Sequence, residues 1–157
     1  MFQLLLADLL SPDRVKIPLE STDKVGLIGE LCAVVARASG VTEEEEAEIR
    51  QAVLDREKVL STGIGGGVAI PHGKSGAVDE LVLAAGRTRA PVDFEALDAR
   101  PVRLVLLLVG PESAAALHVK VLSRISRVLR SRALRERLVQ AATAAEFLAT
   151  LREAESR

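Results

Sequence analysis

Aromatic side chains are nearly absent from this sequence: they make up 2% of its 157 residues, and neither Trp nor Tyr occurs. The hydrophobic core must therefore be built from aliphatic residues, which dominate the 48% hydrophobic content. Proteins that hold single-stranded nucleic acid commonly stack its bases on aromatic side chains, so that mode of binding is poorly supported. The formal net charge of −1 gives no electrostatic argument for DNA or an anionic membrane as a partner.

Long hydrophobic runs and cysteines are also scarce. The apolar amino terminus, MFQLLLADLL, has no basic lead, contains Asp8 and is too short to span a membrane. The single cysteine, Cys32, excludes an internal disulfide and a metal site built from cysteines. It lies in the apolar run GLIGELCAVVARA, which predicts a small core residue. We therefore expect a soluble, cytoplasmic protein that does not insert into a membrane.

Three segments have the patterns of β-strands. RVKIPLE alternates as a half-buried strand does, and Pro18 marks it as an edge strand because proline cannot donate to a ladder. ELVLAAGRT is a second strand. PVRLVLLLVGP is apolar at nearly every position from Leu104 to Val109, which is typical of a strand buried on both faces.

Helical patterns precede and follow these strands. A short helix is expected from Leu4 to Leu10, and a longer one from about Thr22 to Ser39 that ends at Gly40. Its apolar stripe consists of Val25, Ile28, Leu31, Cys32 and Val35. A T-x-x-E capping box at Thr42 opens the next helix, which runs to about Lys58.

The last third of the chain is expected to be helical. The first of its helices runs from about Ser113 to Arg130 on a stripe of Leu117, Val121, Ile125 and Val128. Two more follow, and the last has a second capping box at Thr143 and Glu146. Helices that alternate with buried strands predict one α/β domain with a central sheet.

The segment STGIGGGVAIPHGKSG, residues 61–76, invites a nucleotide-loop interpretation that its spacing does not support. A P-loop has the pattern G-x-x-x-x-G-K-[ST], and counting back from the Gly-Lys-Ser ending puts Val68 where the first glycine is needed. The dinucleotide pattern G-x-G-x-x-G also meets Val68 at its third glycine. A metal site is weakly supported, because His72 and His118 are the only histidines and no carboxylate stands at ligand spacing from His72. We expect neither a metal nor a cofactor.

His72 is the remaining candidate in this segment. Pro71 before it stiffens the backbone, and Gly73 after it leaves room around the ring, so the imidazole is expected at the end of a strand. A neutral imidazole is nucleophilic near pH 7 and can take a phosphoryl group without a separate base. A histidine in an ordinary glycine-rich turn is the alternative interpretation.

His118 and Arg56 each have a structural and a functional interpretation. His118 lies beside the apolar stripe of its helix, where a histidine is more often packed or hydrogen-bonded than catalytic. Sites in α/β proteins nevertheless gather where central strands end and helices begin, so His118 can lie beside His72. Arg56 comes near a helix end, where an arginine is usually solvated or capping.

The linked motifs resemble the enzyme IIA proteins of the bacterial sugar phosphotransferase system, in the mannitol/fructose class that includes the nitrogen-regulatory IIA proteins. The resemblance rests on DREKVLSTGIGGGVAIPHGKSG, PVDFEALDARPVRLVLLLVGPES and ALHVKVLSRISRVL, and it covers nearly the whole chain as one domain, residues 1–157. It implies an α/β fold with a mixed central sheet flanked by helices. It also implies that His72 accepts a phosphoryl group from the histidine phosphocarrier HPr or a nitrogen-branch counterpart, with His118 as a nearby second histidine.

The same resemblance places the Arg56 guanidinium near the phosphoryl group, and the Thr62 hydroxyl is expected to add a hydrogen bond. Two roles follow for such a phosphotransferase. It can pass phosphate to the IIB domain of a fructose or mannitol transporter, or it can act as a regulatory module whose phosphorylation changes which target protein it binds. The absence of a fused IIB or membrane segment and the presence of Lys74 favour the nitrogen-regulatory branch.

Overall fold

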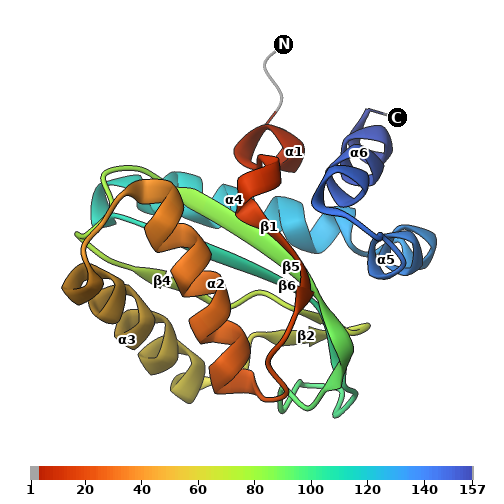
Figure 1. The fold of residues 1–157 in the computed structure, drawn as a ribbon, viewed down its shortest axis with the longest axis horizontal. Helices are drawn as coiled ribbons and strands as arrows, with labels where there is room; N and C mark the ends of the chain where they lie inside the picture. The colour runs from red at the N-terminus through yellow and green to blue at the C-terminus, as the bar shows by residue number, and fades with distance from the viewer. Residues whose placement is uncertain (1–3, 157) are drawn as a thin grey trace.

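One mixed sheet lies between two groups of helices in a computed structural model that describes residues 4–156 (Figure 1). Its central strands are β5 (Val82–Val92) and β6 (Val102–Gly110), which pair antiparallel. β1 (Val15–Leu19) pairs in parallel with the other side of β5 and forms one edge of the sheet, as Pro18 predicted. The mixed α/β fold with helices on both sides is thereby confirmed.

Three short strands complete the other side of β6. β3 (Val68–Ala69) and β4 (His72–Lys74) follow one another along β6, both parallel to it, and β2 (Gly63–Gly65) pairs antiparallel with β3. The sequence predicted a strand only directly before His72, where β3 lies, and predicted neither β2 nor β4. The ladder partners of β3 and β4 in β6 lie 36 residues further along the chain (Val68 with Leu104, His72 with Leu108), and β2 pairs with β3 rather than with β6. Local alternation of side chains cannot reveal such pairings.

β6 separates two hydrophobic cores because its side chains alternate between the faces of the sheet. Leu104 and Leu106 contribute to one core, whereas Val105 and Leu107 contribute to the other. Each of these four residues is at most 2% exposed. The expectation of a central strand buried on both faces is confirmed.

The first core lies under α2 (Lys24–Ser39) and α3 (Glu43–Val59). The predicted end of α2 at Gly40, with a φ of 66°, and the capping box of Thr42 and Glu45 are both present. Cys32 is fully buried, and this burial raises the pKa of its thiol to about 12. The prediction for Val25 was wrong: it lies in the first turn of α2 at the rim of a surface hollow and is 58% exposed.

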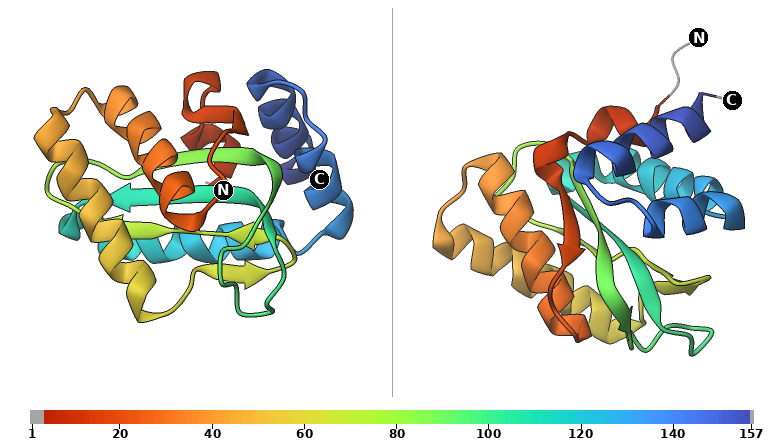
Figure 2. Two further views of the ribbon diagram at one scale, coloured as in Figure 1. Left: turned by 60° about the horizontal axis from the view of Figure 1, so that its bottom comes forward. Right: turned by 45° about the vertical axis from the view of Figure 1, so that its right-hand side comes forward.

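The second core lies under the remaining helices, α1 (Leu6–Leu9), α4 (Ala115–Val128), α5 (Arg132–Val139) and α6 (Ala144–Glu155), as Figure 2 shows. Short 3₁₀ turns, Pro12–Arg14 and Glu112–Ala114, precede β1 and α4. At α6, Thr143 caps the helix as predicted, but the Glu146 carboxylate accepts from the backbone N–H of Ala142 rather than that of Thr143.

The buried carboxylate of Glu155 ties the two ends of the described chain together. It accepts hydrogen bonds from the backbone N–H groups of Leu6 and Ala7 at 2.8 and 2.9 Å and pairs with Arg124 at 3.1 Å. Within residues 4–156, no helix has both the length and the hydropathy needed to cross a membrane.

Candidate active site

The register of β4 against β6 decides where His72 points. His72 stands opposite Leu108, and Gly73 stands opposite Val109. Because Val109 belongs to the core under α3 and Leu108 to the core under α4, His72 lies on the α4 side of the sheet. His72 is thus the first residue of a strand, rather than the residue after one as the sequence suggested.

Gly73 has a different role from the one expected of it. A Cβ atom at this position would lie 3.0 Å from the backbone nitrogen of Val53 and 3.1 Å from its Cγ2 atom. The missing side chain therefore lets α3 approach β4 closely, which brings the end of α3 toward His72.

His118 comes from the first turn of α4, directly beyond the end of β6, and meets His72 edge to face. The two ring centroids are 5.6 Å apart, and the ring planes make an angle of 66°. His118 is 3% exposed and shares the buried side of α4 with Val121 and Ile125. The expected stripe was wrong at one position, because Leu117 is 40% exposed and His118 occupies the buried face instead.

The half-buried ring of His72 is held through one nitrogen. Its Nδ1 atom lies 2.8 Å from the carbonyl oxygen of Ile70, and only a protonated Nδ1 can donate to that carbonyl. The neutral ring therefore carries its lone pair on Nε2. Burial lowers the pKa of His72, and the charge of Arg56 adds to this effect, while the Ile70 carbonyl and Glu57 act in the opposite direction.

His118 is held neutral more strongly. Burial lowers its pKa to about 4, with further lowering by His72 and Lys74 and an opposing contribution from Glu112. Its Nδ1 atom is buried and has no hydrogen-bond partner among the residues that the structure describes. The pair thus presents two neutral imidazoles at neutral pH, one with a free Nε2 nucleophile.

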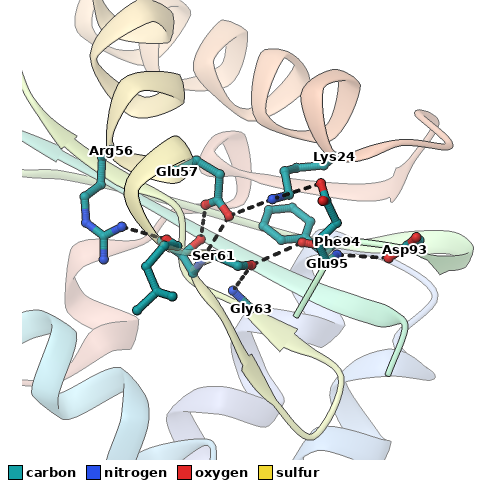
Figure 3. Close-up of polar contacts among 10 residues, drawn as sticks. Lys24, Arg56, Glu57, Ser61, Gly63, Asp93, Phe94 and Glu95 are labelled. Carbon is teal, nitrogen blue, oxygen red and sulfur yellow. Dashed lines mark hydrogen bonds and ion pairs between the residues drawn. The ribbon is translucent and has the colours of Figure 1, made fainter. Parts of the chain in front are cut away.

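Arg56 lies in the last turn of α3, where its Nη1 donates to the carbonyl of Leu60 at 2.8 Å. This is the capping contact that its place near a helix end suggested. Figure 3 shows that Arg56 and Glu57 point to different sides of the helix end. The charge of Arg56 is nevertheless close enough to His72 to lower its pKa.

Thr62 is 4% exposed, and its hydroxyl donates to the Glu57 carboxylate at 2.5 Å. Its backbone N–H donates to the same carboxylate at 3.0 Å. The hydrogen bond predicted from Thr62 to a phosphoryl group therefore requires this hydroxyl contact to break.

Glu57 itself was missed as a functional candidate, although it stands in the Arg-Glu pair that the motif contains. Its side chain is 4% exposed and pairs with Lys24 of α2 at 3.1 Å (Figure 3). One signal was available: Glu57 follows Ile49 and Val53 at helical spacing, and both of these residues are buried. A charged residue on the buried side of a helix needs a partner.

The three consecutive glycines comprise the last residue of β2 and the turn into β3, which lies beside the start of β6. Gly65, Gly66 and Gly67 have φ values of 99°, 65° and 79°, which favour glycine. The backbone N–H of Gly66 donates to the carboxylate of Asp98 at 3.1 Å. The Gly66 N–H thus already has a carboxylate acceptor and is not presented to a phosphate, as it would be in a phosphate-binding loop.

Comparison with known proteins places the chain among phosphotransferase components. The family model described as the phosphoenolpyruvate-dependent sugar phosphotransferase system, EIIA 2, matches residues 8–154. A nitrogen regulatory protein of Bradyrhizobium diazoefficiens is 38% identical over 133 residues, which are 85% of this chain and 85% of that protein. The crystal structure of the nitrogen regulatory protein IIA-Ntr from Neisseria meningitidis matches with a TM-score of 0.84 and 34% identity, over 93% of this chain and 98% of that one.

A relative of different organisation is the PTS system fructose-specific EIIABC component of Bacillus subtilis. It is 35% identical over 136 residues, which are 87% of this chain but only 21% of that protein. The matched region is therefore found both in a protein of similar length and as a small part of a much longer one.

Proposed function

The chain belongs to the EIIA 2 family of the phosphoenolpyruvate-dependent sugar phosphotransferase system, and we propose that His72 is the residue that carries its phosphoryl group. The observation that carries this proposal is the fixed orientation of the ring, in which Nδ1 faces the Ile70 carbonyl and Nε2 is left free. A neutral, half-buried imidazole beside a second one suits a phosphoryl acceptor.

The transfer is a direct exchange of P–N bonds. The Nε2 lone pair of His72 forms a bond to phosphorus while the P–N bond of the donor's phosphohistidine breaks, and the donor imidazole leaves with that electron pair. The Nδ1 proton stays in place, and its hydrogen bond to the Ile70 carbonyl stabilises the positive charge that the ring gains.

His118 and Arg56 are proposed to stabilise the charge on the transferred group. Neutral His118 can donate an N–H to a phosphoryl oxygen without placing a second cation beside the reacting nitrogen. Arg56 uses Nη1 at the Leu60 carbonyl, and its other N–H groups are available to phosphoryl oxygens. Thr62 is proposed to join them if its hydroxyl leaves Glu57 in the phosphorylated state.

The test is phosphorylation with purified components. Incubation with phosphoenolpyruvate, enzyme I and HPr should give the wild-type protein an acid-labile phosphate, and His72→Ala should abolish it. His118→Ala should retain the modification at a slower rate. A wild-type protein that gains no phosphate, or a His72→Ala variant that gains as much as wild type, overturns the proposal.

The nitrogen-regulatory role is favoured over sugar transport by the relatives that match over most of their own length and are named nitrogen regulatory proteins. The donor is then a nitrogen-branch counterpart of HPr, and phosphorylated His72 controls binding of a target protein. The alternative is transfer to the IIB domain of a sugar transporter. Comparing initial rates with HPr and with its nitrogen-branch counterpart separates the two, since the physiological donor should react faster.

A further inference from the structure

A continuous series of polar contacts leads from the first residue of α2 to the imidazole of His72. It begins at Lys24, whose Nζ atom lies 3.1 Å from Oε2 of Glu57. The Glu57 carboxylate then accepts both the backbone N–H and the hydroxyl of Thr62, at 3.0 and 2.5 Å. Figure 3 shows Glu57 at the centre of this cluster, between α2 and the segment that follows α3.

The second half of the series runs through backbone groups. The carbonyl of Thr62 accepts the N–H of Ile70 at 2.9 Å, and the carbonyl of Ile70 faces Nδ1 of His72 at 2.8 Å. The peptide groups on both sides of Ile70 are thus held between Thr62 and the reacting histidine. Glu57 is separated from the ring by only two residues of this series, Thr62 and Ile70.

The cost of placing Glu57 here argues that it does more than join helices. Its side chain is 4% exposed, and a buried carboxylate loses most of its hydration. The ion pair with Lys24 and the two hydrogen bonds from Thr62 offset this loss, and Lys24 also pairs with Glu95 at 3.5 Å and lies 5.2 Å from the centre of the Phe94 ring. A leucine in line with Ile49 and Val53 would pack α3 without such a charge.

We propose that Glu57 is a positioning residue for phosphoryl transfer, a role that rests on the proposed function of His72. By holding Thr62, it fixes the Ile70 peptide, which keeps the proton of His72 on Nδ1 and leaves Nε2 as the nucleophile. Glu57 touches neither the phosphoryl group nor a partner protein in this role. It acts on phosphoryl transfer through the orientation and the tautomer of the His72 ring.

Two substitutions test whether Glu57 positions the His72 ring or only stabilises the fold. Glu57→Gln keeps the shape but removes the negative charge that faces Lys24, and its amide N–H forces the Thr62 hydroxyl to accept a hydrogen bond instead of donating one, so the contacts that fix Thr62 are weakened. Thr62→Val removes only the hydroxyl and retains the backbone contacts, and it serves as the test if Glu57→Gln does not fold. Each variant is examined by nitrogen-15 NMR of the histidine rings, which reports the tautomer, and by phosphorylation kinetics.

We expect the wild-type His72 ring to be protonated at Nδ1 and both variants to gain the Nε2-protonated form. In Glu57→Gln, kcat for phosphorylation should fall by about 10- to 100-fold, the effect of a reacting group displaced by roughly 1 Å. The KM for the donor protein should not change, because Glu57 is buried. Thr62→Val should show a smaller shift of the His72 tautomer, and for this variant the tautomer alone tests the proposal, because the Thr62 hydroxyl is also proposed to bind the phosphoryl group.

Glu155→Gln is the matched control, since Glu155 is also a buried carboxylate that binds backbone N–H groups and a cation. It should lower the unfolding temperature while leaving the His72 tautomer and kcat unchanged. If Glu57→Gln behaves in the same way, Glu57 only supports the fold and the proposal is wrong. If wild-type His72 takes no phosphate, the proposed function fails, while the tautomer of the unmodified variants still decides whether Glu57 positions the ring.

Discussion

The two histidines of the site differ in what surrounds their ring nitrogens. Nδ1 of His72 has the Ile70 carbonyl as its partner, whereas Nδ1 of His118 is buried without one among the described residues. His118 is also the more deeply buried of the two. Protonation of His118 therefore places a positive charge in the core without a hydrogen-bond partner at Nδ1, which is unfavourable in the folded protein and lowers the pKa of His118.

The lowered pKa of His118 predicts that the free energy of unfolding decreases in mild acid. The pKa of His118 is about 4 in the folded protein and near 6.5 when unfolded. Between these pH values the unfolded chain binds more protons, so the free energy of unfolding falls as the pH is lowered from about 6.5 to about 4. At 1.36 kcal/mol per pKa unit the loss is at most roughly 3 kcal/mol, measurable by urea denaturation across this range.

His118→Gln isolates this contribution because glutamine does not titrate. The variant should lose less stability than wild type over the same pH range, and the loss that remains comes in part from His72, whose pKa is also lowered by burial. Glu30, whose pKa is lowered to about 2 mainly by its hydrogen bonds to Lys16 and Ser21 against the opposing effect of burial, adds its own loss only below its ordinary value of 4.5. Equal pH dependence in wild type and His118→Gln would contradict the prediction.

The sequence was sufficient to predict which residues form the site, but not all of the contacts that hold them in place. His72, His118 and Arg56 were all selected, and the structure brings the two histidines into contact. Glu57 was passed over, because its importance depends on Thr62 and Lys24 meeting it from separate elements. Leu117 was assigned the buried position that His118 holds, since a hydrophobic stripe gives no reason to bury a histidine instead.

At the scale of elements, the approach of α3 to β4 is what couples the helix end to His72. It predicts that Gly73→Ala damages both stability and activity. The new Cβ would lie 3.0 Å from a backbone nitrogen of α3, which cannot move without shifting the helix. We expect a loss of about 1–3 kcal/mol in the free energy of unfolding, as for other overpacked positions. Phosphorylation should slow as well, because α3 carries Arg56.

Gly76→Ala provides the comparison for this variant. A Cβ atom at Gly76 meets nothing within 4 Å, so the substitution should change stability by less than about 0.5 kcal/mol. Denaturant unfolding and the rate of phosphorylation measure both variants. If Gly73→Ala were as stable and as active as Gly76→Ala, the close packing of α3 on β4 would not be what positions the site.

Long elements were predictable and short ones were not. α2, α3 and β6 each bury a periodic set of side chains, and the caps at Gly40 and Thr42 mark their limits in the sequence. β2, β3 and β4 contain two or three residues each, and half of these residues are glycine or alanine. β3 and β4 form because β6 offers hydrogen-bonding groups beside them, and β2 pairs in turn with β3. These pairings depend on the assembled sheet and not on the local sequence.

Over the whole molecule, the site lies where β4 and β6 end and α4 begins. β4 is parallel to β6, so their carboxyl ends lie at the same edge of the sheet, and His118 follows in the first turn of α4. This is the region where α/β proteins commonly bind their ligands. Two large apolar side chains of α4, Leu117 and Val119, are 40% and 65% exposed on either side of His118 in the sequence.

These two side chains predict where the phosphoryl donor docks. A protein donor must bury surface around His72 to bring its own histidine within reach, and exposed apolar residues supply the centre of such an interface.

Each buried side chain of this size contributes about 1.5–3 kcal/mol, so Leu117→Ser together with Val119→Ser should raise the KM for the donor by at least about 10-fold. The kcat should change little, because neither side chain has a polar group that can act on the phosphoryl group. Leu97→Ser, in the connection at the opposite end of β6 and 62% exposed, should leave KM unchanged. Initial rates over a range of donor concentrations test this, and an unchanged KM in the double variant would place the docking surface elsewhere.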